Sequence, residues 1–395
     1  MLLSPLAGCH AVWLKWGKSL KGRFVQIAMP AILTLIMSLS TLAEEETNGL
    51  PQEQPVSKAA NLEPRQLVPL VRLSSFPSWV TSVAFSPDGK LLAAGINGAV
   101  QFIDLDRKSV IREIVVRSGQ VRALSFSSDG TVIATGGYQN VSLWDLAQGG
   151  LVKEFKGHRG YVTSLAFSPD GRRLATASDD ETAYVWTVEG TETPLLFKKH
   201  RLPVTGVAWS PDGMWIATSA GDDTRPTRGG EVKIWAASTG EVEQSFELHA
   251  KGATGVAFSH DGAYLASSGM DETVNVYDIH AKKALGFFAG HSRSVNAVVF
   301  HPDRKTAISI SGGRAVGKNE LKIWELATGE ELATAEGHES RITAVALSRN
   351  GETLATGGHD KSLAVWDIGF LSIGLPEVTV TQGRPEAPKK SVQTK

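Results

Sequence analysis

One stretch of the chain has the residue types of a phosphate-binding loop. Residues 312–319 read GGRAVGKN and fit G-x-x-x-x-G-K, a pattern in which backbone N–H groups and a lysine surround phosphates. The stretch ends in Asn319, however, where such a loop needs a Ser or Thr hydroxyl for magnesium. It also leads into LKIW, a strand-like segment, so no helix N-terminus would face the phosphates. We therefore expect an elongated loop rather than a nucleotide site.

Histidine is the second residue type that could do chemistry, since the chain has ten. H-E-x-x-H and G-x-S-x-G do not occur, and no carboxylate pair converges in the sequence. The single cysteine, Cys9, excludes internal disulfides and zinc-thiolate sites. We predict no catalytic, cofactor-binding or metal site. Five histidines recur at one repeated position, spread along the chain rather than clustered: His158, His200, His249, His291 and His338.

The elements that carry these side chains belong to a repeat. The sequence segment VAFSPDGKLLAAG, which begins at Val83, is one of seven similar copies in the chain. The large apolar residues inside the copies are 41, 41, 42, 49, 42 and 47 residues apart. A period of about 40–45 residues is typical of a propeller with four-stranded blades. Those residues are Phe85, Phe126, Phe167, Trp209, Phe258, Phe300 and Leu347.

Each copy predicts a strand, a tight turn and a second strand. Asp-Gly pairs, such as Asp88-Gly89, supply the positive φ of a short hairpin, whereas Asp303-Arg304 departs from this pattern. A third strand follows and ends in an aromatic residue, except at Ile103 in the first copy. We predict an all-β fold, a seven-bladed β-propeller of four-stranded antiparallel blades. Residues 67–75, LVPLVRLSS, are expected to close the ring as an N-terminal outer strand on the last blade.

These units resemble WD repeats, and the resemblance covers about residues 67–368. The dipeptides Trp144-Asp145 and Trp366-Asp367 carry it, with degenerate forms in other copies. Gly-His pairs before the inner strands are the second element, at Gly157-His158, Gly290-His291 and Gly337-His338. A WD-repeat propeller is expected to hold other molecules rather than transform them.

The resemblance implies a buried hydrogen-bonded chain of His, Ser or Thr, Asp and Trp within a blade. Such a chain has a physical reason, because a buried carboxylate and imidazole must be paired. Blades one, two, four and six carry Asn97, Tyr138, Gly229 and Lys318 where the Asp should be, so we expect apolar packing to hold those blades. The matching residues, all given structural roles, are His158, Thr176, Asp180 and Trp186 in blade three, His249, Ser267, Asp271 and Tyr277 in blade five, and His338, Thr356, Asp360 and Trp366 in blade seven.

Partner-binding candidates come from the rim that the WD-repeat family forms with the loops before the innermost strands. The residue six positions before each inner-strand marker lies on this rim, and it is Trp79, Gln120, Tyr161 or Arg341 in four copies. Trp, Tyr and Arg dominate interface energetics, so we expect anchors among them, with packing of Trp79 onto blade one as the alternative. Two longer loops add cations that could meet an acidic partner or be surface decoration: Arg225, Arg228, Arg314 and Lys318.

The ends of the chain differ from the repeats. Basic residues precede an uncharged stretch, residues 24–43, which is typical of a secretory signal or a membrane anchor. We predict residues 1–43 as that segment, 44–66 as a flexible linker, 67–368 as the propeller and 369–395 as a largely disordered tail. Lys plus Arg number 40 against 41 Asp plus Glu, which gives no basic field for nucleic acid.

The function predicted from these observations is a non-catalytic scaffold for other proteins, exported or membrane-anchored. One alternative is a periplasmic propeller enzyme or small-ligand binder that uses the central channel. A second alternative is a cytoplasmic scaffold, if the leader does not function.

Overall fold

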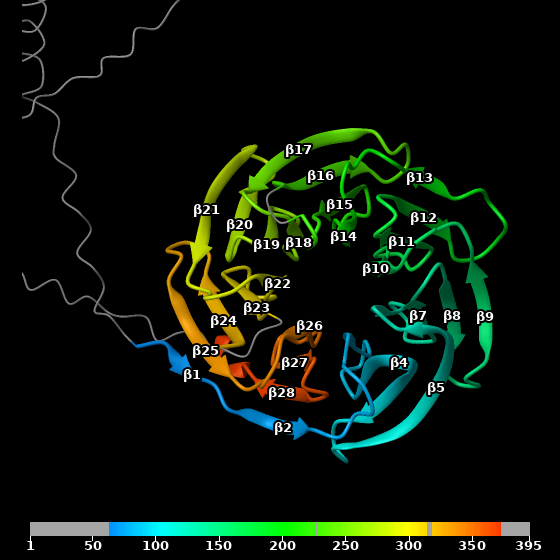
Figure 1. Cartoon of the computed structure of the whole chain (residues 1–395), viewed down its shortest axis with the longest axis horizontal. Helices are drawn as coiled ribbons and strands as arrows, with labels where there is room; N and C mark the ends of the chain where they lie inside the picture. Colours follow the sequence, from blue (N-terminus) through cyan, green and yellow to red (C-terminus); the bar gives the residue numbers. More distant parts are fainter. Residues whose placement is uncertain (1–62, 226–227, 314–317, 373–395) are drawn as a thin grey trace, which may run out of the picture. The chain divides into compact units, whose positions relative to one another are not determined.

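The protein is described by a computed structural model in which residues 63–225, 228–313 and 318–372 are defined. Antiparallel four-stranded blades surround a central channel (Figure 1), which confirms the predicted all-β seven-bladed propeller. Within the described ranges the only helical element is a 3₁₀ turn, η1 (Gly369–Leu371). Its Leu371 is buried against blades six and seven, so packing continues beyond residue 368.

The strands run outward from the channel in each blade. Blade two has β6 (Ala123–Phe126), β7 (Val132–Gly136), β8 (Val141–Asp145) and β9 (Leu151–Phe155), and blade three has β10 (Val162–Phe167), β11 (Arg173–Ser178), β12 (Ala183–Thr187) and β13 (Leu195–Phe197). Blade four has β14 (Val204–Trp209), β15 (Trp215–Ala220), β16 (Gly230–Ala236) and β17 (Val242–His249), and blade five has β18 (Ala253–Phe258), β19 (Tyr264–Gly269), β20 (Thr273–Asp278) and β21 (Lys283–Ala289). Blade six has β22 (Val295–Phe300), β23 (Thr306–Ser311), β24 (Glu320–Glu325) and β25 (Glu331–Glu336), and the chain supplies β26 (Ile342–Leu347), β27 (Thr353–Gly358) and β28 (Leu363–Asp367) to blade seven.

Blade one has β3 (Ser82–Phe85), β4 (Leu91–Asp104) and β5 (Ser109–Gln120). The long β4 supplies both middle strands, because it folds back on itself. Gly98 adopts a φ of 80° at the bend, and the N–H of Leu105 donates to the carbonyl of Lys90 at 3.2 Å. The blade is therefore four-stranded like the others.

The ring closes through the N-terminal strand β2 (Pro69–Leu73), as predicted. It pairs antiparallel with β28 and becomes the outer strand of blade seven (Figure 1). Upstream of it, the short β1 (Arg65–Gln66) lies parallel to β25 on blade six. Arg65 also lies over the ring of Phe370 at 4.4 Å. The N-terminal part of the described chain thus joins the two last blades.

The core lies between the blades. Seven clusters of buried apolar side chains are found among the described residues, and each combines residues from two neighbouring blades. In the cluster between blades seven and one, for example, Val80 and Leu92 pack with Leu363. Successive blades therefore stabilise one another by removing apolar surface from water.

The alternating direction of the strands gives the disc two different faces. Connections between the second and third strands, and from each outer strand to the next inner strand, lie on one face, which we call the loop face. The tight turns after the first and third strands lie on the opposite face, which we call the turn face. In the first turn of blade one, Ser86 Oγ donates to Asp88 Oδ1 at 2.6 Å and Gly89 has a φ of 72°.

Candidate functional site

Blades three and seven each contain a buried chain of four polar side chains. In blade three, Trp186 Nε1 donates to Thr176 Oγ1 at 2.9 Å, and Thr176 Oγ1 lies 2.8 Å from His158 Nε2. His158 Nδ1 then lies 3.1 Å from Asp180 Oδ2. The indole can only donate and the carboxylate can only accept, so every group in the chain is satisfied if the imidazole is neutral with its proton on Nδ1. Blade seven repeats these contacts with Trp366, Thr356, His338 and Asp360.

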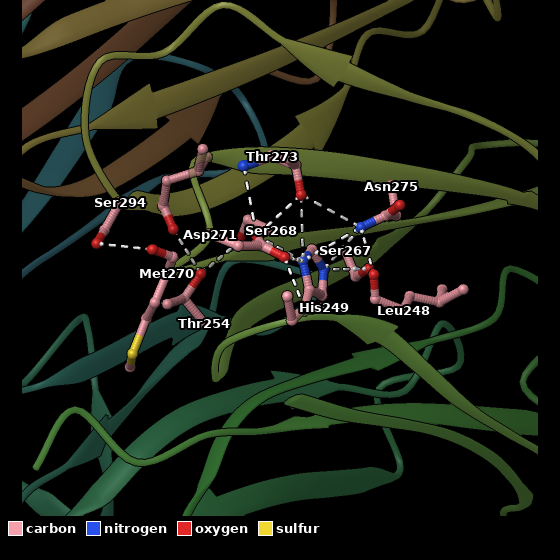
Figure 2. Close-up of polar contacts among 12 residues, drawn as sticks. Leu248, His249, Thr254, Ser267, Ser268, Met270, Asp271, Thr273, Asn275 and Ser294 are labelled. Carbon is pink, nitrogen blue, oxygen red and sulfur yellow. Dashed lines mark hydrogen bonds and ion pairs between the residues drawn. The ribbon is translucent and has the colours of Figure 1, made fainter. Parts of the chain in front are cut away.

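Blade five keeps the polar half of this chain. His249 contacts Asp271 through Nδ1 at 3.0 Å and Ser267 through Nε2 at 2.9 Å, and Figure 2 shows these groups with Asn275 beside the imidazole. Tyr277 takes the place of the indole and packs against Phe246, with ring centroids 4.3 Å apart. The blade therefore combines a His–Asp contact with aromatic packing.

Blades four and six differ from the prediction that they are held mainly by apolar packing, because each contains a buried polar network. His200 Nδ1 lies 3.0 Å from Glu231 Oε2, and its Nε2 lies 2.7 Å from Thr218 Oγ1, which also accepts from Trp235. The acid is a glutamate that belongs to the third strand rather than an aspartate in the preceding loop, and its longer side chain spans the extra distance. Blade six has the same arrangement with His291, Ser309, Trp324 and Glu320, although His291 Nδ1 and Glu320 Oε2 are 3.5 Å apart.

Burial and hydrogen bonding have opposite effects on the pKa values of the carboxylates in these networks. The hydrogen bond from His200 lowers the pKa of Glu231 to about 2, although burial opposes this. Burial alone would raise the pKa of Asp360, but hydrogen bonds from His338 and Ser362 lower it to about 2. Burial also lowers the pKa of His200 below its ordinary value. At neutral pH the carboxylates of Glu231 and Asp360 are therefore ionised and the imidazole of His200 is neutral.

The same carboxylates hold the loops of the loop face. Asp180 Oδ2 accepts the backbone N–H of Arg159 at 2.7 Å, and Asp360 Oδ2 accepts that of Glu339 at 2.9 Å. Each bond joins the connection between the second and third strands to the segment that precedes the inner strand of the same blade. Tyr161 follows Arg159 by two positions, so the network fixes the backbone that presents it.

Three predicted partner-binding residues meet at a cavity of about 470 Å³ on the loop face. Trp79, Gln120 and Tyr161 line it, together with Lys361 and other loop residues. The side chains of Trp79 and Tyr138 remain about half exposed, at 48% and 51%. We call Trp79, Gln120, Arg122, Tyr138, Tyr161 and Lys361 the loop-face patch.

Ring contacts hold the aromatic side chains of this patch in place. Trp79 stacks on His359 of blade seven, with centroids 4.2 Å apart, so it does not fold onto blade one. Arg122 lies 3.9 Å over the ring of Tyr161, and Tyr138 meets the same ring edge-on at 5.0 Å. The patch thus has large, partly exposed rings on a supported backbone.

The other predicted partner-binding residues lie apart from the patch. The guanidinium of Arg341 donates to Asn296 Oδ1 at 3.1 and 2.8 Å, so it turns towards blade six. Arg225 pairs with Asp222 at 3.4 Å, and Lys318 pairs with Glu336 at 2.8 Å. Arg228 is exposed in the loop of blade four, and Arg314 lies outside the described residues. Residues 312–319 fall between β23 and β24 of blade six, and 314–317 lie outside the described residues.

The central channel is lined by a ring of polar side chains. One side chain in six of the seven blades donates to a backbone carbonyl of the next blade, at 2.6 to 2.9 Å. In blade two the position holds Arg122, whose Nε donates to Gln120 at 3.1 Å. Five hydroxyl groups and one side-chain amide therefore join six of the seven pairs of neighbouring blades around a space of about 220 Å³. The six donors are Thr81, Thr163, Thr205, Thr254, Asn296 and Thr343.

The sequence profile of the WD domain, G-beta repeat, matches this chain seven times. The chain belongs to the WD-repeat family. The WD-repeat matches cover residues 68–104, 110–145, 149–187, 192–235, 240–278, 282–325 and 329–367, one for each blade.

Three curated proteins illustrate how similar other WD-repeat chains are. Pre-mRNA-processing factor 19 of Caenorhabditis elegans is 30% identical over 97 residues, 25% of this chain and 19% of that protein. The coronin-like protein of Saccharomyces cerevisiae is 34% identical over 22% of this chain and 12% of its own length. Nuclear distribution protein PAC1 of Arthroderma benhamiae is 35% identical over 25% and 22%. The similarity to these three relatives thus spans less than a quarter of each.

Several WD-repeat residues that matter here were not among the predicted ones. Glu231 and Glu320 were missed because the acid was sought at a single position. A usable signal was present, since each of the five histidines stands 18 residues before the Ser or Thr that it contacts. No comparable spacing marks Arg122 and His359, which reach Tyr161 and Trp79 from neighbouring blades.

The part of the chain that the structure describes contains no group of three His, Cys, Asp or Glu side chains placed to hold a metal ion. It also contains no helix that is long and apolar enough to cross a membrane, and residues 24–43 lie outside it.

Proposed function

We propose that this propeller is a non-catalytic platform that binds a partner protein through the loop-face patch. The observation that supports this most directly is the half-exposed Trp79, held by His359 at the cavity that Tyr161 and Gln120 also line. Trp and Tyr are enriched at protein interfaces, and here two such rings gather at one cavity. Membership of the WD-repeat family supports the same function, because propellers of this family bind other proteins.

The chemistry of the patch suits protein recognition. Trp, Tyr and Arg side chains are enriched where alanine substitution costs most binding energy. Stacking already restricts Trp79 and Tyr161, so little side-chain entropy remains to be lost on binding. The partner we expect has an apolar or aromatic protrusion with hydrogen-bonding groups, which would meet Gln120 and Lys361 at the cavity.

A comparison of three proteins in crosslinking capture from the native host tests the proposal. The wild type and Phe287→Ala should capture the same protein, since Phe287 is 64% exposed but lies on the outer strand β21. The double variant Trp79→Ala, Tyr161→Ala should lose that protein while its melting temperature stays close to that of the wild type. Equal capture by all three proteins would place the interaction elsewhere.

We also propose that the chain is exported or anchored in a membrane. Basic residues followed by the uncharged residues 24–43 are the basis of this proposal. Cell fractionation should recover the full chain outside the cytosol. Replacing Leu33 and Leu35 by Arg should keep the chain in the cytosol. Recovery of the wild type with cytosolic markers would favour the cytoplasmic scaffold instead.

A further inference from the structure

Three successive junctions between blades are closed by a basic side chain on the turn face. Arg112 of β5 donates to the carbonyl of Leu146 in blade two. Lys153 of β9 donates to the carbonyls of Thr187 and Val188 in blade three, at 3.0 and 2.9 Å. Each head group reaches the turn that follows the aromatic third strand of the next blade.

The junction between blades three and four uses a different position for the same purpose. Arg173, at the start of the second strand, donates to the carbonyls of Ala237 and Gly213, both at 3.2 Å. Ala237 is equivalent to Leu146 and Val188 in two respects. Each stands two positions after the aromatic residue of the third strand, and each donates its N–H to the carbonyl of the residue just before the second strand of its own blade. The guanidinium of Arg173 also lies 4.7 Å over the ring of Trp209.

The junction between blades four and five has neither cation. In blade two, Lys153 lies opposite Leu143 on the neighbouring strand. The equivalent residue in blade four is Gln244, which lies opposite Ile234. Trp215 replaces Arg173 at the start of the second strand. A cavity of about 260 Å³ lies here, lined by both residues and by Ile279, the counterpart of Ala237. We call this cavity the junction pocket.

A polar atom of a residue that lines the junction pocket has no partner. Oε1 of Gln244 is buried, and among the described residues nothing donates a hydrogen bond to it. A buried acceptor without a donor destabilises the fold. Gln244 thus lines the junction pocket with other atoms of its side chain, and a turn of its amide would bring the unpaired acceptor to a ligand's N–H group.

The remaining lining selects the kind of ligand. Trp215, Ile234 and Phe258 provide apolar and aromatic surface. Three carboxylates, from Asp212, Glu243 and Asp261, line the same space. Lys282 pairs with Glu243 at 3.0 Å and Arg304 lies 3.9 Å from Asp261, so two of the three already have a cation beside them. An acidic rim over an aromatic floor complements a planar cation on an alkyl stem.

We propose that the junction pocket binds the arginine side chain of a partner polypeptide. The guanidinium donates to the carboxylates, and its stem packs along Trp215 and Phe258. A turn of the Gln244 amide makes Oε1 a further acceptor for it. The ligand thus occupies the space that Arg112, Lys153 and Arg173 fill from within the chain at the three preceding junctions. Because the pocket lies on the turn face, this proposal is independent of the loop-face patch.

Two blocked peptides test the proposal on the full chain. One is Gly-Gly-Arg-Gly-Gly, and the other carries citrulline, which keeps the shape of arginine and lacks its charge. Binding is followed through the indole N–H resonance of Trp215, assigned with Trp215→Phe. The arginine peptide should shift this resonance saturably, with an affinity about tenfold or more above that of the citrulline peptide, as expected for one charged hydrogen bond.

Variants of Gln244 separate the pocket from other acidic surfaces. Gln244→Lys should abolish peptide binding and keep or raise the melting temperature, since the new side chain closes the junction as Lys153 does. Gln244→Glu should tighten binding, and Ser245→Lys on the exposed side of β17 should leave it unchanged.

If the arginine peptide causes no saturable shift, or binds as well to folded Gln244→Lys, the proposal is wrong. Equal affinity for the citrulline peptide, or weaker binding to Gln244→Glu, would also overturn it. Trp79→Ala, Tyr161→Ala should bind the peptide like the wild type, so this test and the capture experiment can fail separately.

Discussion

At the scale of single residues, the direction of each hydrogen bond explains the buried networks. In blade four, Trp235 donates to Thr218, Thr218 donates to the neutral ring of His200, and that ring donates to Glu231. Removing any member leaves a buried donor or acceptor unpaired, which costs more than an average hydrogen bond contributes. The carboxylate at the end of the chain makes this arrangement sensitive to acid.

We expect Glu231→Gln to reduce the acid sensitivity of folding. The pKa of Glu231 is about 2 in the folded protein against an ordinary value of 4.5, so the unfolded chain binds the proton first as the pH falls. Ionised Glu231 therefore contributes stability above pH 4.5 that is lost towards pH 2, on the order of 3 kcal/mol. The variant should be less stable than the wild type at pH 7, and the difference should shrink as the pH falls.

Urea unfolding across this pH range measures the effect. Glu241→Gln, an exposed glutamate in the same blade, is the matched control and should follow the wild-type curve. A Glu231→Gln curve that stays parallel to the wild type down to pH 2 would contradict the assignment.

At the scale of elements, the turn between the first two strands is built alike in six blades. Its glycine has a φ between 70° and 79°, a region in which a side chain is strained. Blade six has Arg304 there, with a φ of 62°. His301 replaces the serine of the other turns, and its Nε2 donates to the carbonyl of Gly351 at 2.9 Å. Blade six thus keeps the turn with residues less suited to it.

Arg304→Gly should stabilise the protein, because glycine adopts this φ without strain. We expect a gain of about 0.5–1 kcal/mol after allowing for the greater freedom of glycine in the unfolded chain. Arg304→Ala is the control, since it also loses the 3.9 Å contact with Asp261 but keeps a Cβ. Chemical denaturation should show a gain for glycine only. Equal stability of the two variants would mean that the backbone is relaxed there.

At the scale of the whole molecule, stability depends on closure of the ring. β2 comes from the start of the propeller and completes the blade at its end. Val71 and Leu73 pack into the cluster between blades seven and one, where Thr343 also donates to the carbonyl of Val80 at 2.7 Å. Closure therefore protects both the edge of β28 and an inter-blade core.

Deleting residues 63–75 should open the ring. We expect a broad thermal transition at a lower temperature and association that increases with concentration, because β28 would become an unpaired edge strand. An equally long deletion, residues 50–62, is the control and should melt like the wild type. Calorimetry and light scattering report the two effects. A sharp, unshifted transition after deletion of 63–75 would show that blade seven is stable without β2.

Much of the fold follows from local pattern. The repeat period, the Asp-Gly turns and the aromatic ends of the third strands predict seven blades, because hairpins form between neighbouring segments. The unpaired segment before the first copy likewise predicts β2. Part of the site could also be predicted from the sequence, because Trp79, Gln120 and Tyr161 occupy one repeated position and meet at one cavity.

The sequence by itself therefore determined the architecture, the closing strand and three residues of the loop-face patch. Only the tertiary structure decided which groups meet across blades, because side chains far apart in the chain are brought together by the curvature of the ring. It placed His359 under Trp79, turned Arg341 towards Asn296 and brought Glu231 to His200. It also left Gln244 lining a cavity where blades one to three have a cation. These outcomes depend on side-chain length and packing between blades, which a repeat period does not encode.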